Sequence, residues 1–158
     1  MKNKIFIFDL DDTLYKEIDF LYSAYREIAG WIELKFSLKG IYAFMLETYK
    51  EQADVFSRLI DTYDLSLTKA DLLSIYRSHR PNIRLELDTL KALEVLKQDF
   101  ILGMITDGRS ITQRNKFQAL GLEQFIENEN LVISEEFGSE KPSERNFMFF
   151  QNKYADAE

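Results

Sequence analysis

The sequence predicts an α/β protein in which an all-helical segment interrupts a parallel β-sheet. An unbroken apolar run, Ile5-Phe6-Ile7-Phe8, ends abruptly in acidic residues, as expected for a strand buried on both faces of a parallel sheet. The apolar residues of positions 15–80 then recur at helical spacing. Beyond Pro81, helical and strand-like patterns alternate, and this order predicts parallel strands joined by right-handed crossovers.

The helical segment has identifiable internal signals. Apolar residues between Ile18 and Phe36 follow one helical stripe, and similar stripes continue as far as Tyr76. Thr68 and Asp71 have the spacing of a capping box, which predicts that a helix begins there. Because proline cannot continue a helix, Pro81 should end this segment. We therefore expect residues 15–82 to form a helical insertion.

The remaining chain should form the sheet and its covering helices. The patterns predict, in order, a helix over 88–98, a strand over 100–105, a helix over 110–120, a strand over 131–133 and a helix over 143–154. Ser110 and Gln113 offer a second capping box, Gly121 a helix stop, and Pro142 a helix start. Residues 1–14 and 83–158 are thus predicted to form one Rossmann-like α/β core.

Composition excludes several classes of protein. The formal charge of −7 and the pI of about 4.9 argue against binding to nucleic acid or to an anionic membrane surface. The chain has no cysteine, so it forms no disulfide and offers no thiolate to a metal. Acid follows the first apolar run too early for a signal peptide, and no stretch reaches membrane-spanning length. We therefore expect a cytoplasmic protein.

Polar clusters follow the predicted strands. They are Asp9 with Asp11 and Thr13, Thr106 with Asp107 and Gly108, and Lys141 in the loop after the third strand. Because parallel strands end at the same edge of a sheet, these clusters should converge although they lie far apart in the sequence. Open α/β sheets bind their ligands at this edge.

The residue types suit phosphoryl transfer from a monoester. A carboxylate can attack phosphorus and form an aspartyl phosphate, while a second carboxyl group protonates the leaving oxygen and later deprotonates water. Neighbouring carboxylates attract Mg²⁺, which prefers oxygen ligands and phosphate. A hydroxyl group, turn amides and a lysine ammonium can neutralise the transferring group.

Three stretches resemble the motifs of the haloacid dehalogenase-like superfamily. Residues 5–14 resemble its first motif, Ile105-Thr106-Asp107-Gly108 its second and Lys141-Pro142 its third. An apolar tetrapeptide followed by Asp-x-Asp-x-Thr should arise by chance in roughly one chain in a thousand of this length. Residues 15–82 resemble the small helical cap of one branch of the superfamily.

This resemblance implies a role for each motif residue. Asp9 would be the nucleophile and a metal ligand. Asp11 would be the general acid and base, with its main-chain carbonyl also facing Mg²⁺. Thr106 and Lys141 would hold the phosphoryl group of a small phosphorylated substrate, together with the turn at Asp107 and Gly108. Because halide leaves without a proton, the acid at Asp11 favours phosphate esters over carbon–halogen bonds.

Several of these residues also have simpler interpretations. Thr106 could be only a loop hydroxyl, Asp107 a turn former and Lys141 an exposed lysine. His79, the only histidine, is expected to have a surface or hinge role rather than to act as a base. Arg77, Arg80 and Arg109 could contact an anionic substrate or remain solvated charges.

The superfamily's fourth motif, an acidic cluster after a further strand, is missing from this sequence. Its absence predicts an unprotected edge at Ile5–Phe8, weakened metal binding and a sheet that is incomplete at the C-terminus, as in a fragment or a truncated product. A catalytically incompetent binding module and a phosphomutase therefore stay open beside a Mg²⁺-dependent phosphatase. A phosphorylated receiver domain is disfavoured, since it would need a strand where residues 15–80 are helical.

Overall fold

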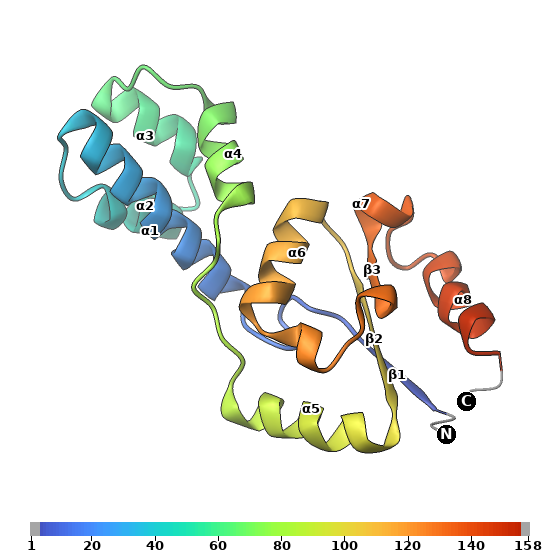
Figure 1. Ribbon diagram of the computed structural model, residues 1–158. Helices are drawn as coiled ribbons and strands as arrows, with labels where there is room; N and C mark the ends of the chain where they lie inside the picture. The colour runs from blue at the N-terminus through green and yellow to red at the C-terminus, as the bar shows by residue number, and fades with distance from the viewer. Residues whose placement is uncertain (1–3, 156–158) are drawn as a thin grey trace.

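The computed structural model describes residues 4–155 (Figure 1). Its elements are, in chain order, β1 (Ile5–Phe8), α1 (Glu17–Phe36), α2 (Ile41–Lys50), α3 (Val55–Tyr63), α4 (Lys69–Ser78), α5 (Leu87–Asp99), β2 (Ile101–Thr106), α6 (Ser110–Ala119), η1 (Leu122–Gln124), η2 (Asn128–Asn130), β3 (Leu131–Ile133), α7 (Ser134–Phe137) and α8 (Glu144–Lys153). This order confirms the predicted α/β class. No helix among these residues is both long and apolar enough to cross a bilayer.

The three strands form one parallel sheet in the order β1-β2-β3. Phe8, the last residue of β1, lies opposite Met104, and Thr106, the last residue of β2, lies opposite Ile133 at the end of β3. Since each strand ends within two residues of its neighbour's level, the segments that follow them emerge at one edge of the sheet, as the sequence predicted.

Helices cover the two faces of the sheet unequally (Figure 1). On one face, Leu102 and Met104 pack with Leu93 of α5 and Phe117 of α6 in the larger hydrophobic core. On the other face, Ile105 and Val132 pack against Phe150 of α8, with Ile5 and Ile7 at the margin. β2 is therefore buried on both sides, in keeping with its unbroken apolar sequence.

β1 is less buried than its sequence indicates. The apolar run predicted a strand covered on both faces, but Phe6 is 42% exposed. The prediction is wrong here because β1 is an edge strand: among residues 4–155 it pairs only with β2, and no strand pairs with its outer edge. The expectation of an unprotected edge at Ile5–Phe8 is thereby confirmed.

Helices α1 to α4 pack around a second hydrophobic core, which includes Ile28, Ile32 and Leu59. The predicted capping box is present: Thr68 Oγ1 accepts from the Asp71 N–H, and the Asp71 carboxylate accepts from the Thr68 N–H. α4 ends at Ser78, and the chain returns to the sheet through Pro81. No strand interrupts this stretch, in line with the helical pattern of the sequence.

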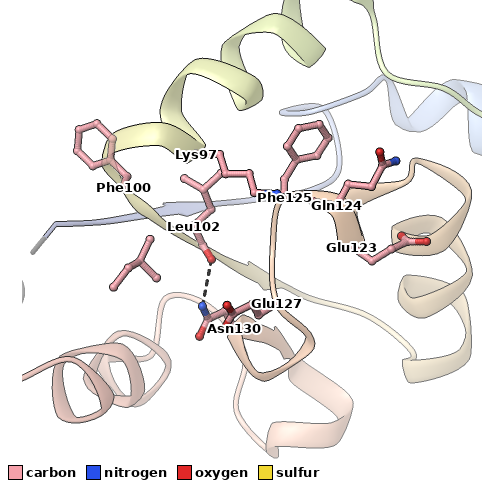
Figure 2. Close-up of a pocket in the computed structure, with 9 residues that line it drawn as sticks. Lys97, Phe100, Leu102, Glu123, Gln124, Phe125, Glu127 and Asn130 are labelled. Carbon is pink, nitrogen blue, oxygen red and sulfur yellow. Dashed lines mark hydrogen bonds between the residues drawn. The ribbon is translucent and has the colours of Figure 1, made fainter. Parts of the chain in front are cut away.

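A hollow of about 370 Å³ lies at the opposite end of the sheet from the motif residues. Phe100 and Leu102, at the start of β2, line this hollow together with Phe125 (Figure 2). Asn130 Nδ2 donates to the Leu102 carbonyl at 3.3 Å, and its Oδ1 accepts from Lys153 and Tyr154 near the end of α8. Asn130 thus fixes α8 to the sheet, and none of the predicted site residues lines this hollow.

Replacing Gly103 of β2 by alanine should weaken the packing of α8. A Cβ atom there would lie 2.6 Å from Cε1 of Phe150, a ring that is buried and cannot move aside. We expect a loss of about 1–3 kcal/mol in the free energy of unfolding, measured in urea.

Gly30→Ala is the matched control, because a Cβ atom at that position in α1 meets no atom within 4 Å. It should stabilise the protein by about 0.5–1 kcal/mol, the usual gain from glycine to alanine within a helix. A Gly103→Ala protein as stable as the wild type would show that Phe150 does not pack against β2.

Candidate active site

Asp9 lies directly after β1 and is paired with Lys141. Lys141 Nζ is 2.6 Å from Asp9 Oδ1, which also accepts from the Leu10 N–H at 2.7 Å. Asp9 Oδ2 has no hydrogen-bond partner within residues 4–155. The side chain of Asp9 is 43% exposed and that of Lys141 28% exposed, so both are accessible from solvent. One carboxylate oxygen is thus fixed beside a cation while the other stays open.

The segment after β2 meets the same loop. The Lys141 N–H donates to Asp107 Oδ1 at 3.1 Å, so Asp107 fixes the backbone of the residue that pairs with Asp9. The Gly108 N–H donates to Ser134 Oγ, directly after β3, at 3.0 Å. Thr106 Oγ1 is buried and has no hydrogen-bond partner among the described residues.

Asp11 is held by three side chains. Its Oδ1 accepts from Tyr15 Oη and from Lys116 Nζ, each at 2.6 Å, and its Oδ2 accepts from Gln113 Nε2 at 3.0 Å. Lys116 is only 3% exposed, which is rare for lysine and requires a partner of opposite charge. Burial, followed by the hydrogen bond to Asp11, raises the pKa of Tyr15, so its hydroxyl remains a donor.

The predicted capping box at the start of α6 is wrong. The N-cap residue is Arg109, which makes no side-chain cap, and the Ser110 N–H donates instead to Glu135 Oε2 at 2.7 Å. Gln113 faces the site, where its Nε2 donates to the Asp107 carbonyl at 2.8 Å and to Asp11. The stronger carboxylate acceptors from distant segments prevail over the local pattern.

Most predicted site residues therefore form one connected set. Asp9 contacts Lys141, Lys141 contacts Asp107, and the carbonyl of Asp107 is joined to Asp11 through Gln113. Thr106 precedes Asp107 in the chain, although its side chain contacts none of the others by a hydrogen bond. Gly108 has φ of 142°, and a Cβ atom there would lie 2.7 Å from Gln113 Nε2, so only glycine leaves room for this bridge.

A cluster of aromatic side chains connects the helical segment to the site. Phe20 of α1 packs edge-on against Tyr76 of α4 at 5.4 Å between ring centroids, and its ring lies 4.5 Å from Lys116 Nζ. His79 packs against Phe20 at 4.7 Å, and its Nδ1 contacts the Tyr76 carbonyl at 2.8 Å. His79 is 6% exposed, so the expected surface role is wrong, whereas its place at the end of α4 agrees with a hinge.

The arginine near the site has a local partner. Arg109 Nη1 lies 2.5 Å from Glu135 Oε1, and this contact holds the pKa of Glu135 below its usual range. Because Arg109 already has a carboxylate partner, its availability to an anionic substrate is reduced. The charge of Arg77 lowers the pKa of Glu135 to a smaller extent.

The oxygen atoms at this edge fit an incomplete magnesium site. Mg²⁺ commonly binds through one or two carboxylates, with water and a substrate phosphate completing its shell. The open Oδ2 of Asp9 supplies one such ligand, and the adjacent main chain at Asp11 could supply a carbonyl. No cluster of three or more His, Cys, Asp or Glu side chains within residues 4–155 forms a metal site by itself.

The sequence matches a known protein family over nearly all of its length. Residues 6–154 match the haloacid dehalogenase-like hydrolase family, which is nearly the whole chain. The chain belongs to this hydrolase family. The match includes both segments of the sheet and the helices between them, as the motif resemblance implied.

Two curated proteins resemble this haloacid dehalogenase-like chain. The glyceraldehyde 3-phosphate phosphatase of Methanocaldococcus jannaschii is 29% identical over 148 residues, covering 86% of this chain and 64% of that protein. The protein of the same name from Methanopyrus kandleri is 28% identical over 159 residues, covering 92% of this chain and 67% of its own length. The chain thus spans about two thirds of the length of these relatives.

A solved structure supports the haloacid dehalogenase-like fold. YfnB of Bacillus subtilis, named as a HAD hydrolase and solved with magnesium bound, aligns with a TM-score of 0.62 at 19% identity. The alignment covers 97% of this chain and 73% of YfnB. At this identity the likeness shows the shared fold, with both the sheet and the helical segment in place.

Sequence reasoning missed two residues of this haloacid dehalogenase-like site and misassigned a third. Tyr15 and Lys116 were not singled out, and Gln113 was interpreted as a capping residue. A signal was present, since Gln113, Lys116, Phe117 and Leu120 have the spacing of one helix face. Because Gln113 and Lys116 share this face with apolar residues that pack into the core, they must be buried too and need polar partners inside the protein.

The Asp11→Ala variant should be destabilised through Lys116. Removing the carboxylate leaves the Lys116 ammonium buried without its partner of opposite charge. Breaking a buried pair in this way typically costs about 3–5 kcal/mol in the free energy of unfolding. Equilibrium unfolding in urea measures the loss.

The double variant Asp11→Ala with Lys116→Met is the control for this interpretation. Because methionine removes the unpaired charge and keeps an unbranched side chain beside Phe20, it should recover most of the lost stability. If the double variant is no more stable than Asp11→Ala alone, the buried charge is not the cause.

The stability of the protein should depend on His79 in mildly acidic solution. Burial lowers the pKa of His79 from 6.5, Lys116 lowers it further, and the Tyr76 carbonyl and Glu27 oppose this. Near and below pH 6.5 the His79 of the unfolded chain therefore binds more protons than that of the folded chain. The free energy of unfolding decreases as the pH is lowered through this range. The slope from one group is at most about 1.4 kcal/mol per pH unit.

His79→Asn isolates this contribution, because asparagine keeps a donor near the Tyr76 carbonyl and does not titrate. Between pH of about 7.5 and 5.5, urea unfolding should show a larger loss for the wild type than for the variant. Equal losses in the two proteins would contradict the assignment.

Proposed function

We propose that the protein is a Mg²⁺-dependent phosphatase that hydrolyses a small phosphate monoester through an aspartyl-phosphate intermediate. The observation that carries this proposal is the asymmetric environment of Asp9, whose Oδ1 is bound by Lys141 and Leu10 while Oδ2 is open. A nucleophilic carboxylate needs one free oxygen and a nearby cation to offset the phosphate's charge. Both conditions are met at this sheet edge.

In the first half of the reaction, Asp9 Oδ2 attacks phosphorus, and the bond from phosphorus to the ester oxygen breaks. Asp11 enters this step as the neutral acid, gives its proton to the leaving alkoxide and becomes a carboxylate, while the phosphoryl group becomes bound to Asp9. In the second half, Asp11 takes a proton from a water molecule, which attacks phosphorus. Inorganic phosphate leaves and the Asp9 carboxylate is restored.

The remaining residues would hold the transferring group. Lys141 would neutralise phosphoryl oxygens with its ammonium, and the unpartnered hydroxyl of Thr106 would donate a hydrogen bond. Asp107 and Gly108 would shape the turn that brings Lys141 and Gln113 into place. Bound through Asp9 and the Asp11 carbonyl, Mg²⁺ would supply positive charge to the phosphate.

We propose that residues 15–82 act as a cap over the core formed by residues 1–14 and 83–158. The support is that Phe20 and Tyr76 of the helical segment reach the side chains around Asp11. Closure of such a segment excludes water before the chemistry begins. Because both curated relatives are named glyceraldehyde 3-phosphate phosphatases, a three-carbon sugar phosphate is the substrate to test first.

A binding module without catalysis is the second candidate. It is favoured by the lack of a complete carboxylate cluster for a metal among residues 4–155. Calorimetry with inorganic phosphate distinguishes the two candidates. Binding that is unchanged by Mg²⁺, with no turnover of any ester, would support the module and contradict the phosphatase.

The phosphatase proposal predicts that Asp9→Asn abolishes hydrolysis. The chain of residues 1–158 should release phosphate from nitrophenyl phosphate and from glyceraldehyde 3-phosphate, and chelation of Mg²⁺ should stop the reaction. Because an amide cannot form the acyl phosphate, kcat should fall by at least about 1,000-fold in the variant.

Asp64→Asn is the matched control. Asp64 ends α3 in a left-handed conformation that asparagine also adopts, and it lies in the helical segment away from the sheet edge. Its kcat should equal that of the wild type. Full activity in Asp9→Asn, or hydrolysis independent of metal, would exclude the mechanism.

A further inference from the structure

Helix α6 carries a buried lysine that faces the acid–base residue of the proposed mechanism. Lys116 is 3% exposed, and its Nζ lies 2.6 Å from Asp11 Oδ1. The same ammonium lies 4.5 Å from the ring centroid of Phe20 and 5.9 Å from that of Tyr15. Aromatic faces attract cations, so the two rings and the Asp11 carboxylate together hold the Lys116 ammonium in one position.

The contacts of Asp11 make its two oxygen atoms unequal. Each carboxylate oxygen has about two lone-pair positions. Lys116 and Tyr15 occupy both positions of Oδ1, whereas Gln113 occupies one position of Oδ2. One lone pair of Oδ2 therefore stays open within the described residues, and it is the only one on this carboxylate.

The orientation of Gln113 is determined by its partners. Its side chain meets two acceptors, the Asp107 carbonyl and Asp11 Oδ2, so the nitrogen with its two hydrogens must face them. Both hydrogens are thereby engaged. Gln113 connects Oδ2 to the backbone that follows β2, and so fixes Asp11 relative to the segment that holds Asp107 and Lys141.

We propose that Lys116 is the positioning residue for Asp11. By holding Oδ1 together with Tyr15, it presents Oδ2 as the oxygen that exchanges a proton with the leaving group and with water. This inference rests on the proposed phosphatase function and adds to it the residue that orients the acid. Lys116 touches neither the substrate nor the reacting atoms, and it acts through Asp11.

A purely structural role for the pair has less support. A buried ion pair adds little net stability, because the cost of removing two charges from water largely cancels their attraction. An apolar residue at 116 would pack as well beside Phe20. A buried charge aimed at Asp11 is better explained by what it does to Asp11.

Lys116→Met tests the proposal with two substrates, because Asp11 has two tasks. Nitrophenolate leaves without a proton, so enzyme phosphorylation by nitrophenyl phosphate does not need the acid, whereas the later attack of water does need the base. An alkyl phosphate such as glyceraldehyde 3-phosphate needs Asp11 in both halves. The experiment uses the whole chain of residues 1–158 with Mg²⁺ and rapid mixing.

We expect the variant to release a first equivalent of nitrophenolate at a rate within about 3-fold of the wild type. Later turnover should slow by about 10- to 100-fold, a share of what acid–base catalysis contributes, and phosphorylated protein should accumulate. Hydrolysis of the alkyl phosphate should slow by at least as much, with no initial burst. KM for both substrates should stay nearly unchanged.

Tyr15→Phe is the second variant, since it removes the other donor to Oδ1 and keeps the ring. It should show the same retained burst and slowed turnover. Lys91→Met, which removes an exposed lysine of α5, is the matched control and should behave as the wild type.

The outcomes separate this inference from the proposed function. If the burst and the later turnover of Lys116→Met fall equally, or if neither changes, Lys116 does not position Asp11 and the phosphatase assignment stands. If the wild type forms no phosphoprotein and hydrolyses no ester, the phosphatase assignment fails and the role of Lys116 fails with it.

Discussion

The parallel pairing of β1 with β2 is the constraint on which the site depends. With Phe8 opposite Met104 and Thr106 opposite Ile133, the three strands end at nearly one level. Asp9, Asp107 and Ser134 directly follow these ends, and each contacts a segment that follows another strand of the sheet. A shift of one residue in the register would turn these side chains to the wrong face.

Charge at this edge is organised in two separate pairs. Asp9 with Lys141 is partly exposed, so its attraction is screened by solvent and its contribution to stability is small. Asp11 with Lys116 is largely buried, so its geometry is fixed and each partner depends on the other. The first pair is therefore open to a ligand, whereas the second sets the position of one carboxylate.

The helical segment and the core share this second pair. Phe20 reaches from α1 to cover Lys116, and it packs on Tyr76 and His79 where α4 returns toward the sheet. Movement of the segment would therefore alter the surroundings of Lys116 and, through it, of Asp11. The contact between Phe20 and Lys116 therefore joins the helical segment to the side chain that pairs with Asp11.

Local sequence by itself determined the three strands and the longer helices, but not the short helix α7 or the way α6 begins. Unbroken apolar runs defined β2 and β3, helical spacing defined α1 to α4, and Thr68 with Asp71 marked a helix start, because each of these signals acts between residues close in the chain. Asp9, Asp11 and Asp107 were identified because they follow strand ends, and Lys141 because it lies in the loop beyond the third strand. Parallel strands bring such segments together at one edge of the sheet.

Only the tertiary structure decided which side chains meet. Asp11 and Lys116 are 105 positions apart. Gln113 donates hydrogen bonds to Asp11 and to the Asp107 carbonyl instead of capping the start of its own helix. No local propensity encodes such a choice, because the strength of a polar contact depends on burial and on partners from distant segments. For the same reason the exposure of Phe6 was visible only once β1 proved to be an edge strand.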